Sequence, residues 1–219
     1  MATDFHVASV RSDIYKPLIL QEHYSRRVPP IKYAYALYEE DKVVGVVTFG
    51  PPASPQVARS VVEEQMRDKI IELNRLVIIT KTKNAASALV GKALSLLPPS
   101  IVVSYADGGV GHVGYVYQAT NFIYCGTAKA HDCQYFYEGR VFHPRTLASM
   151  GISAPKKWAA MVGATILPPQ PKHRYVFFTG NKKFKRGARN ALLWPIVCAY
   201  PKGETKRHAA PAYYEMGAL

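Results

Sequence analysis

Acidic residues are missing from a long stretch of this 219-residue chain. Between Gly139 and Gly203 there is no Asp or Glu, whereas the same span holds twelve Lys and Arg. The rest of the chain is nearly neutral, with sixteen basic and fifteen acidic residues. An ordinary solvated surface mixes both signs, while a block of one sign attracts polyanions. The distribution therefore favours a nucleic acid as partner over a basic surface that has none.

Cysteines and long apolar runs are also scarce. The three cysteines are few and odd in number, which argues against a disulfide framework and favours a reducing, cytoplasmic setting. No run of about 18 apolar residues is present, so we expect no transmembrane helix and no membrane partner. The N-terminus shows no signal peptide pattern. We expect one domain over residues 1–219, with a basic region at 139–203 within it.

The pattern of apolar residues predicts an α/β (α+β) fold, because helices and strands alternate and the sheet is expected to be partly parallel. No clear pattern emerges between 127 and 172, and the last fifteen or so residues read as a loosely ordered tail. The expected helices are a region within 11–27, a short one within 51–69, "NAASALVGKALSLL" capped by Asn84 and stopped by Pro98–Pro99, and "VGYVYQAT". The expected strands are "YAYALYE", "DKVVGVVTFG", "IIELNRLVII", "SIVVSYA", "FIYCGTA" and "KHRYVFFT".

The stretch "SYADGGVGHVGYVYQATNFIYCG" carries candidate chemistry. Asp107 ends an apolar strand, at the edge where open α/β sheets bind ligands, although an Asp before Gly-Gly also caps turns. Asp107 and His112 lie close on one loop and could share a metal ion. Two further clusters, His131-Asp132-Cys133 and Glu22-His23, lack a recognised zinc spacing.

A possible phosphate site lies at the start of the long helix. Asn84, Ala85, Ala86 and Ser87 are small and precede or open the first turn, where free N–H groups favour phosphate. Lys81 and Lys83 add positive charge there. The alternative is an ordinary capped helix with two solvated lysines.

The order of these elements resembles the GNAT acyltransferases over about sixty residues. "VYQATNF" at 116–122 fits the family pattern Leu-Tyr-x-x-x-Gly-Phe, with Asn121 in place of the glycine; Asn tolerates left-handed backbone. The resemblance implies a mixed central sheet flanked by helices, with acetyl-coenzyme A bound at residues 84–87 and Asn121. It also implies that Tyr117 is the general acid, although Tyr117 could instead be a core tyrosine. The family's usual Gln/Arg-x-x-Gly-x-Gly/Ala loop is absent.

A narrower resemblance covers much more of the chain. "HYSRR", "ELNRL", "SALVGKAL", "SYAD", "GHVGYVYQATNFIYCG" and the late basic block look like the Mom DNA-modification proteins of bacteriophages. That family is described as GNAT-like and converts adenine in double-stranded DNA to an N6-methylcarbamoyl form, which shields phage DNA from restriction in the host cytoplasm. Acetyl-coenzyme A and iron have been linked to it. The resemblance implies that Asp107, Tyr117 and Arg75 belong to the active site, and Ser87 also fits.

DNA modification of this kind requires a base to leave the stack and be held on an aromatic surface. Tyr24, Tyr105 and Tyr115 are candidates for that surface. Two alternatives remain: a GNAT N-acetyltransferase acting on a protein or small-molecule amine, and a basic nucleic-acid-binding module without catalysis. The residues expected to hold DNA phosphates are Arg26, Arg27, Lys182, Lys183, Lys185, Arg186 and Arg189.

Overall fold

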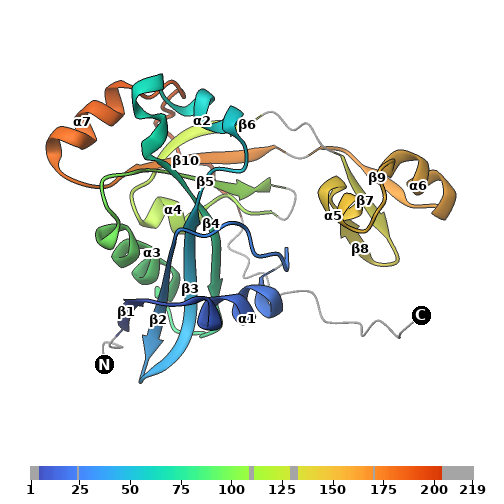
Figure 1. Ribbon diagram of the computed structural model, residues 1–219, viewed down its shortest axis with the longest axis horizontal. Coiled ribbons are helices and arrows are strands. Elements are labelled where there is room, and N and C mark those ends of the chain that lie inside the picture. The colour runs from blue at the N-terminus through green and yellow to red at the C-terminus, as the bar shows by residue number, and fades with distance from the viewer. Residues whose placement is uncertain (1–4, 24, 109–110, 129–132, 170, 204–219) are drawn as a thin grey trace.

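The computed structural model describes residues 5–23, 25–108, 111–128, 133–169 and 171–203, and within these the side chain of Arg145 is not described. The predicted central mixed sheet flanked by helices is confirmed (Figure 1). Its helices are α1 (Ser12–Glu22), α2 (Pro55–Val61), the 3-10 helix η1 (Glu64–Lys69), α3 (Ala85–Leu96), α4 (Tyr115–Ala119), α5 (Pro144–Ser149), α6 (Pro155–Val162) and α7 (Lys182–Asn190). Its strands are β1 (Phe5–Ser9), β2 (Tyr33–Glu39), β3 (Lys42–Gly50), β4 (Ile70–Ile78), β5 (Ile101–Asp107), β6 (Ile123–Ala128), β7 (Gln134–Tyr137), β8 (Arg140–Phe142), β9 (Thr165–Leu167) and β10 (Lys172–Phe178).

The large sheet opens between its two parallel strands. The strand order is β1-β2-β3-β4-β5-β10-β6, and every neighbouring pair is antiparallel except β4 and β5. Those two strands pair over only three residues each, from Ile70↔Ile101 to Glu72↔Val103. The β3–β4 register shifts just beyond, at Asn74, whose amide accepts a hydrogen bond from Thr48 Oγ1 at 2.6 Å. Such a bulge bends the strand, so β4 bends where its pairing with β5 ends.

Helices cover both faces of this sheet. On one face α3 buries Leu89, Val90 and Ala93 against a core that includes Val47 and Phe49. These apolar positions recur at helical spacing, which is why the sequence predicts this helix. On the other face Ile19 of α1 packs with Val46, while α2 and α7 cover β5 and β10. In the described part of the chain no helix is long and apolar enough to cross a membrane.

A small unit is inserted between β6 and β10. We call residues 134–167 the inserted unit; they form a three-stranded sheet in the order β8-β7-β9 with α5 and α6 packed on it. Its core centres on Trp158, whose ring meets the rings of Tyr135, Tyr137 and Phe142 at steep angles. In Figure 1 the unit stands to one side of the large sheet. The basic region at 139–203 is therefore shared among the inserted unit, β10 and α7.

Three local expectations need correction or addition. Asn84 occupies the N-cap position of α3, but its side chain makes no capping hydrogen bond. Its φ of 63° is left-handed, whereas a side-chain cap requires extended backbone at that position, so the prediction of a side-chain cap is wrong. The helix expected within 11–27 ends at Glu22. β1 and α7 were not expected, and the tail predicted at the C-terminus lies outside the described residues from 204 on.

Candidate functional site

Asp107 lies at the end of β5, as predicted, and only 8% of its surface is exposed. The antiparallel register places Lys172 directly opposite, and Lys172 Nζ lies 3.6 Å from the Asp107 Oδ2. The Asp107 carbonyl accepts a hydrogen bond from the His112 N–H at 3.0 Å, which closes the glycine-rich turn. The structure therefore holds a carboxylate at a strand end beside one ammonium group.

His23 and Arg75 form a second part of this region. His23 follows α1 and is 8% exposed; burial, then the charges of Arg75 and His112, lower its pKa from 6.5 to about 3. The Ser25 N–H donates to His23 Nδ1 at 3.1 Å. The imidazole is therefore neutral near pH 7, and its proton lies on Nε2, which makes Nε2 a hydrogen-bond donor.

Arg75 is anchored by backbone carbonyls. Its Nε donates to the Arg27 carbonyl at 2.9 Å and its Nη1 to the Asn74 carbonyl at 2.5 Å. These bonds tie the segment after α1 to the bent part of β4. Arg75 thus ties Arg27 to the part of β4 that lies beyond its last pairing with β5.

Tyr117 is packed as a core residue. Its ring centroid lies 5.3 Å from that of Phe122 and 5.2 Å from that of Tyr175. Gly114 makes this packing possible: a Cβ there would lie 2.6 Å from the Tyr175 ring, and its φ is +82°. Tyr175 pairs with Ser104, three residues before Asp107.

Asp107 and Tyr117 approach β5 from opposite faces. Ala106 belongs to the core cluster that contains Tyr117, whereas Val103 belongs to the cluster under α2 and α7. Side chains along a strand alternate between the two faces, so Asp107 lies on the same face of β5 as Val103. A substrate between the two side chains would have to lie at the open edge where β4 has left β5.

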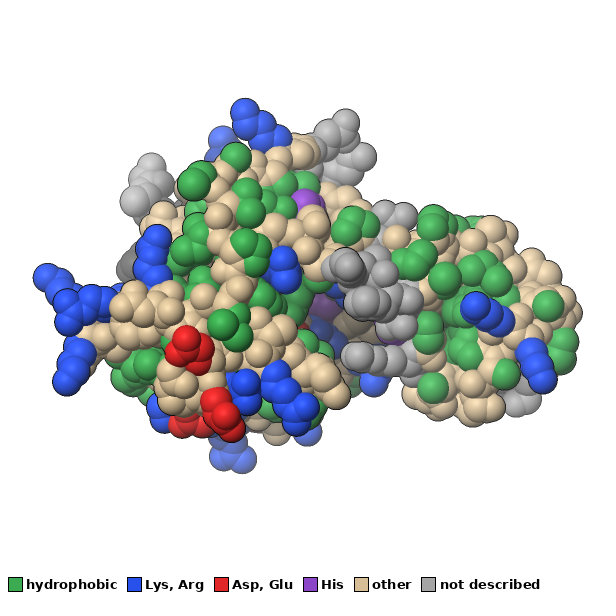
Figure 2. All heavy atoms as spheres, turned by 90° about the horizontal axis from the view of Figure 1, so that it is seen from above, with side chains coloured by type: hydrophobic (Ala, Val, Ile, Leu, Met, Phe, Trp, Pro, Cys, Tyr) green, Lys and Arg blue, Asp and Glu red, His purple; other side chains and the backbone are tan. Residues whose placement is uncertain are grey.

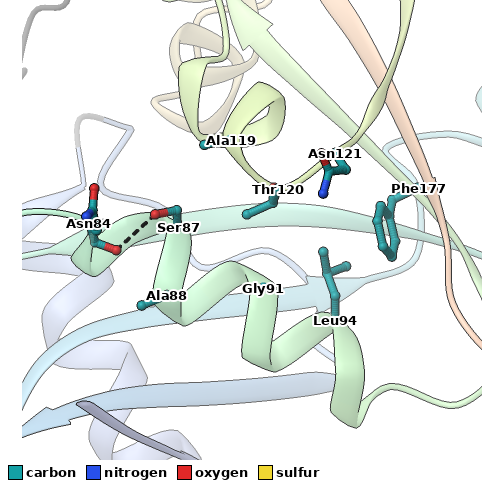
Figure 3. Close-up of a pocket in the computed structure, with 9 residues that line it drawn as sticks. All are labelled: Asn84, Ser87, Ala88, Gly91, Leu94, Ala119, Thr120, Asn121 and Phe177. Carbon is teal, nitrogen blue, oxygen red and sulfur yellow. Dashed lines mark hydrogen bonds between the residues drawn. The ribbon is translucent and has the colours of Figure 1, made fainter. Parts of the chain in front are cut away.

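A groove of about 560 Å³ lies between α3 and the turn after α4 (Figure 3). Asn84, Ser87 and Asn121, three of the five residues predicted to bind the cofactor, line it. Ala85 is instead buried in the core, and Ala86 is not among the lining residues. The remaining lining residues are Ala88, Gly91, Leu94, Ala119, Thr120 and Phe177.

The backbone of the groove explains two of its residues. Asn121 has a φ of 60°, which confirms that Asn here takes the left-handed geometry usual for glycine. Gly91 faces Thr120 across the groove, since a Cβ at Gly91 would lie 3.9 Å from Thr120 Cγ2. Glycine therefore keeps this part of the groove open.

The residues that the structure describes do not group as an iron site requires. Within the described ranges, no three His, Cys, Asp or Glu side chains are grouped so as to hold a metal ion. Of the predicted pair, Asp107 is engaged with Lys172, and His112 meets Asp107 through backbone atoms. His131 and Asp132 lie outside the described residues, so the cluster around Cys133 is not described. We derive no chemical step through iron.

The residues predicted to hold DNA lie at two separate places. Arg27 is exposed beside Arg75, and Arg26 adopts a φ of 44° next to it. α7 begins after the Phe178 end of β10, whereas Asp107 pairs with the opposite end, six residues or about 20 Å away. The side chains of Lys182, Lys183, Lys185, Arg186 and Arg189 are all exposed on α7.

The candidate stacking tyrosines differ in exposure. Tyr105 packs edge-on against Trp194 at 6.1 Å, and burial raises its pKa. Tyr115 is more exposed, and its hydroxyl donates to the Gly203 carbonyl. Tyr24 lies outside the described residues. Between the two described tyrosines, Tyr115 is the one whose ring is exposed.

The sequence predicted no role for Lys172, and it offered His23 only as part of the Glu22-His23 cluster, which lacks a zinc spacing. For His23 a signal existed, because it opens the "HYSRR" motif and was noted beside Glu22. For Lys172 there was none, since only the register of β10 places it opposite Asp107.

The large sheet opens between its two parallel strands, and α3 and the turn after α4 line a groove. Similarity along nearly the whole chain to a methylcarbamoylase shows that the protein is an enzyme. The Mom protein family matches residues 4–201, and the chain belongs to that family. It is 30% identical over 210 residues to the methylcarbamoylase Mom of Escherichia phage Mu, which covers 91% of this chain and 84% of that protein.

Solved structures of acetyltransferases show distant similarity. A GNAT-family acetyltransferase from Bacillus cereus is 12% identical, over 81% of this chain and 99% of that one, with a TM-score of 0.44. An N-acetyltransferase from Staphylococcus aureus is 14% identical, over 80% and 99%, with a TM-score of 0.45. A Bacillus subtilis acetyltransferase in complex with CoA is 11% identical, over 82% and 100%, with a TM-score of 0.43.

Proposed function

We propose that this protein modifies the N6 amine of adenine in double-stranded DNA with a group derived from acetyl-coenzyme A, in a methylcarbamoyl-type reaction that protects phage DNA from restriction. The observation that carries the proposal is the similarity to the phage Mu methylcarbamoylase along nearly the whole chain. The one-sign charge of residues 139–203 supports a polyanionic substrate.

The groove between α3 and α4 supports the cofactor part of the proposal. Asn84 and Ser87 stand at the start of α3, where the N–H groups of a first helical turn favour phosphate, and Asn121 lines the other end of the groove near Leu94 and Phe177. In this proposal the acyl end of the cofactor reaches the gap beyond Glu72 and Val103, where β4 and β5 no longer pair.

The chain's own groups then act on the amine and on the leaving group. The N6 amine is a weak nucleophile and is stacked and paired in duplex DNA, so the base must be extruded. Asp107, oriented by Lys172, accepts a hydrogen bond or a proton from the amine. Tyr117 donates a proton to the departing thiolate. Neutral His23 lies in the same region and leaves Asp107 and Lys172 as the charged pair beside the amine.

Atom counting limits this scheme. A methylcarbamoyl group contains a nitrogen that an acetyl group lacks, so direct acetyl transfer does not give that product. A rearrangement or a redox step with a nitrogen source must follow or precede the transfer. The residues named above serve binding, orientation and proton transfer in any of these routes.

The test is a nucleoside mass spectrum of DNA from cells that express the protein. A modified deoxyadenosine, absent from cells with an empty vector, supports the proposal. Unmodified deoxyadenosine together with newly acetylated protein or small-molecule amines would establish the alternative, an N-acetyltransferase of the GNAT type. DNA binding without any acylated product would establish a binding module.

A further inference from the structure

The inserted unit leaves the large sheet at the level of Asp107. The two sheet residues that flank the insertion are Ala128, the last of β6, and Lys172, the first of β10. Lys172 pairs with Ala128 on one side and with Asp107 on the other. The unit is therefore connected to the end of the sheet that carries Asp107, whereas α7 follows the other end of β10 (Figure 1).

The outer surface of α6 combines basic and apolar side chains. Trp158 and Ala159 turn inward to the core of the unit, while Lys156, Lys157 and Met161 are exposed. Lys157 and Met161 are four residues apart, so they share one face of the helix. Met161 is 84% exposed, and Met150, at 59%, follows the neighbouring α5. Figure 2 shows apolar and basic side chains together on the face of the unit that it presents.

The charge of the unit selects the kind of partner. Residues 133–169 contain Arg140, Arg145, Lys156 and Lys157 but only one acidic residue, Glu138. Glu138 lies in the turn between β7 and β8, so α6 itself carries two lysines and no acid. A second copy of the chain would present the same positive surface and be repelled, whereas the DNA backbone is complementary to it.

We propose that the outer surface of α6 is a DNA-contact surface that holds the duplex next to the target base. Lys156 and Lys157 contact phosphates, and Met161 enters a groove as an apolar wedge that supports the distorted stack while the base is extruded. Proteins that kink or open duplexes use apolar wedges of this type, flanked by cationic side chains. The inference rests on the proposed function, since it names how the same DNA substrate is held.

The experiment uses the full chain with two variants, Lys156→Ala/Lys157→Ala and Met161→Ser. A matched control, Lys16→Ala/Lys42→Ala, removes the same charge from exposed positions on α1 and β3. Duplex affinity is measured by fluorescence anisotropy across a salt series, and modified deoxyadenosine is measured by mass spectrometry. All four residues of the lysine variants, and Met161, are exposed, so the melting temperatures should match that of the parent chain.

We expect the Lys156/Lys157 variant to lower the slope of log affinity against log salt by about 1.8, with a loss of modification, because each phosphate contact contributes about 0.9 to the slope. Met161→Ser should keep the slope and lower modification several-fold. The control should keep both.

Three results separate the possible failures. If the parent chain neither binds nor modifies DNA, the proposed function itself is wrong. If the parent does both and the two α6 variants match it, the function stands and the role of α6 is overturned. If Met161→Ser instead turns a sedimenting dimer into a monomer with unchanged DNA binding, the surface is an interface between copies.

Discussion

Asp107 is the residue on which the proposed chemistry depends most directly. Replacing it by Asn keeps the size of the side chain but removes its ability to accept a proton. We expect Asp107→Asn to lower adenine modification by at least about 100-fold, in the range of general acid–base contributions. Modified deoxyadenosine per cell is the measurement.

DNA affinity of Asp107→Asn should match or slightly exceed that of the parent, since one negative charge is lost. Asp13→Asn, at an exposed position of α1, serves as the control. Modification that survives in Asp107→Asn would assign the proton transfer to another group.

His23 gives the protein a predicted dependence of stability on pH. Its pKa in the folded state, about 3, lies below the value of 6.5 in the unfolded state. The unfolded chain therefore binds the proton first as pH falls, and stability is lost between pH 6.5 and 3. At pH 5 the loss from this group amounts to about 2 kcal/mol.

Urea unfolding at pH 7 and pH 5 measures this effect. In His23→Gln the difference between the two pH values should shrink by that amount, whereas His6→Gln, at an exposed position of β1, should keep the parent's difference. An unchanged difference in His23→Gln would show that the imidazole is not buried as described.

At the scale of single elements, α3 and its groove allow a matched pair of substitutions at Gly91. Gly91→Ala should stabilise the helix by up to about 1 kcal/mol because alanine restricts the unfolded chain, and it adds only one methyl group near Thr120. Gly91→Leu should project into the groove and weaken acetyl-coenzyme A binding at least about tenfold.

Isothermal titration with coenzyme A measures the affinity of both Gly91 variants, and thermal unfolding measures their stability. If Gly91→Leu binds coenzyme A as the parent does, the cofactor lies elsewhere. If Gly91→Leu also unfolds, Thr120→Val tests the opposite wall of the same groove.

The elements differ in how well the sequence predicts them, for physical reasons. α3 is long and has regular apolar spacing, and β5 is an apolar run interrupted only by Ser104 before it ends at Asp107, so both were predicted nearly to their ends. The inserted unit is built from strands of three or four residues and helices of six or eight, which are too short to show a period. The sequence did not predict α7, because five of its nine residues are basic and exposed and leave too few apolar residues to show a helical period.

The same contrast applies to the candidate site. Asp107 and Asn121 could be predicted because strand ends and left-handed positions leave local signals in sequence. The pairing of Asp107 with Lys172 depends on strand register between residues 65 positions apart, which no local pattern encodes. The lowered pKa of His23 likewise depends on burial and then on the charges of Arg75 and His112, which are distant in sequence.

For the whole molecule, the charge of α7 leads to a prediction about salt. Replacing Lys182, Lys183, Lys185 and Arg186 by Ala should flatten the salt dependence of DNA binding by a slope of up to about 3.6, if all four contact phosphate. Modification at saturating DNA should fall less than in Asp107→Asn, because α7 follows the end of β10 opposite to Asp107.

An unchanged slope for the α7 variant would place the DNA elsewhere on the molecule. Together with the α6 variants, this experiment maps how far along the protein the duplex extends. α6 belongs to the unit that precedes the Lys172 end of β10, and α7 follows its Phe178 end. If both helices contribute to the salt slope, the duplex must therefore run along this strand.

The position of β10 also determines the order in which the protein can be completed on the ribosome. β5 and β6 are both synthesised before β10, yet β10 lies between them. Until residue 178 has emerged, both strands keep unpaired edges, which are prone to aggregation.

The inserted unit has its own core, and the strand ends on either side of it pair through Lys172↔Ala128. Once folded, it replaces a long open loop by a short one, which lowers the entropy cost of adding the last strand. A nascent chain that stops before Lys172 should therefore need chaperone protection, whereas one released after Phe178 should not.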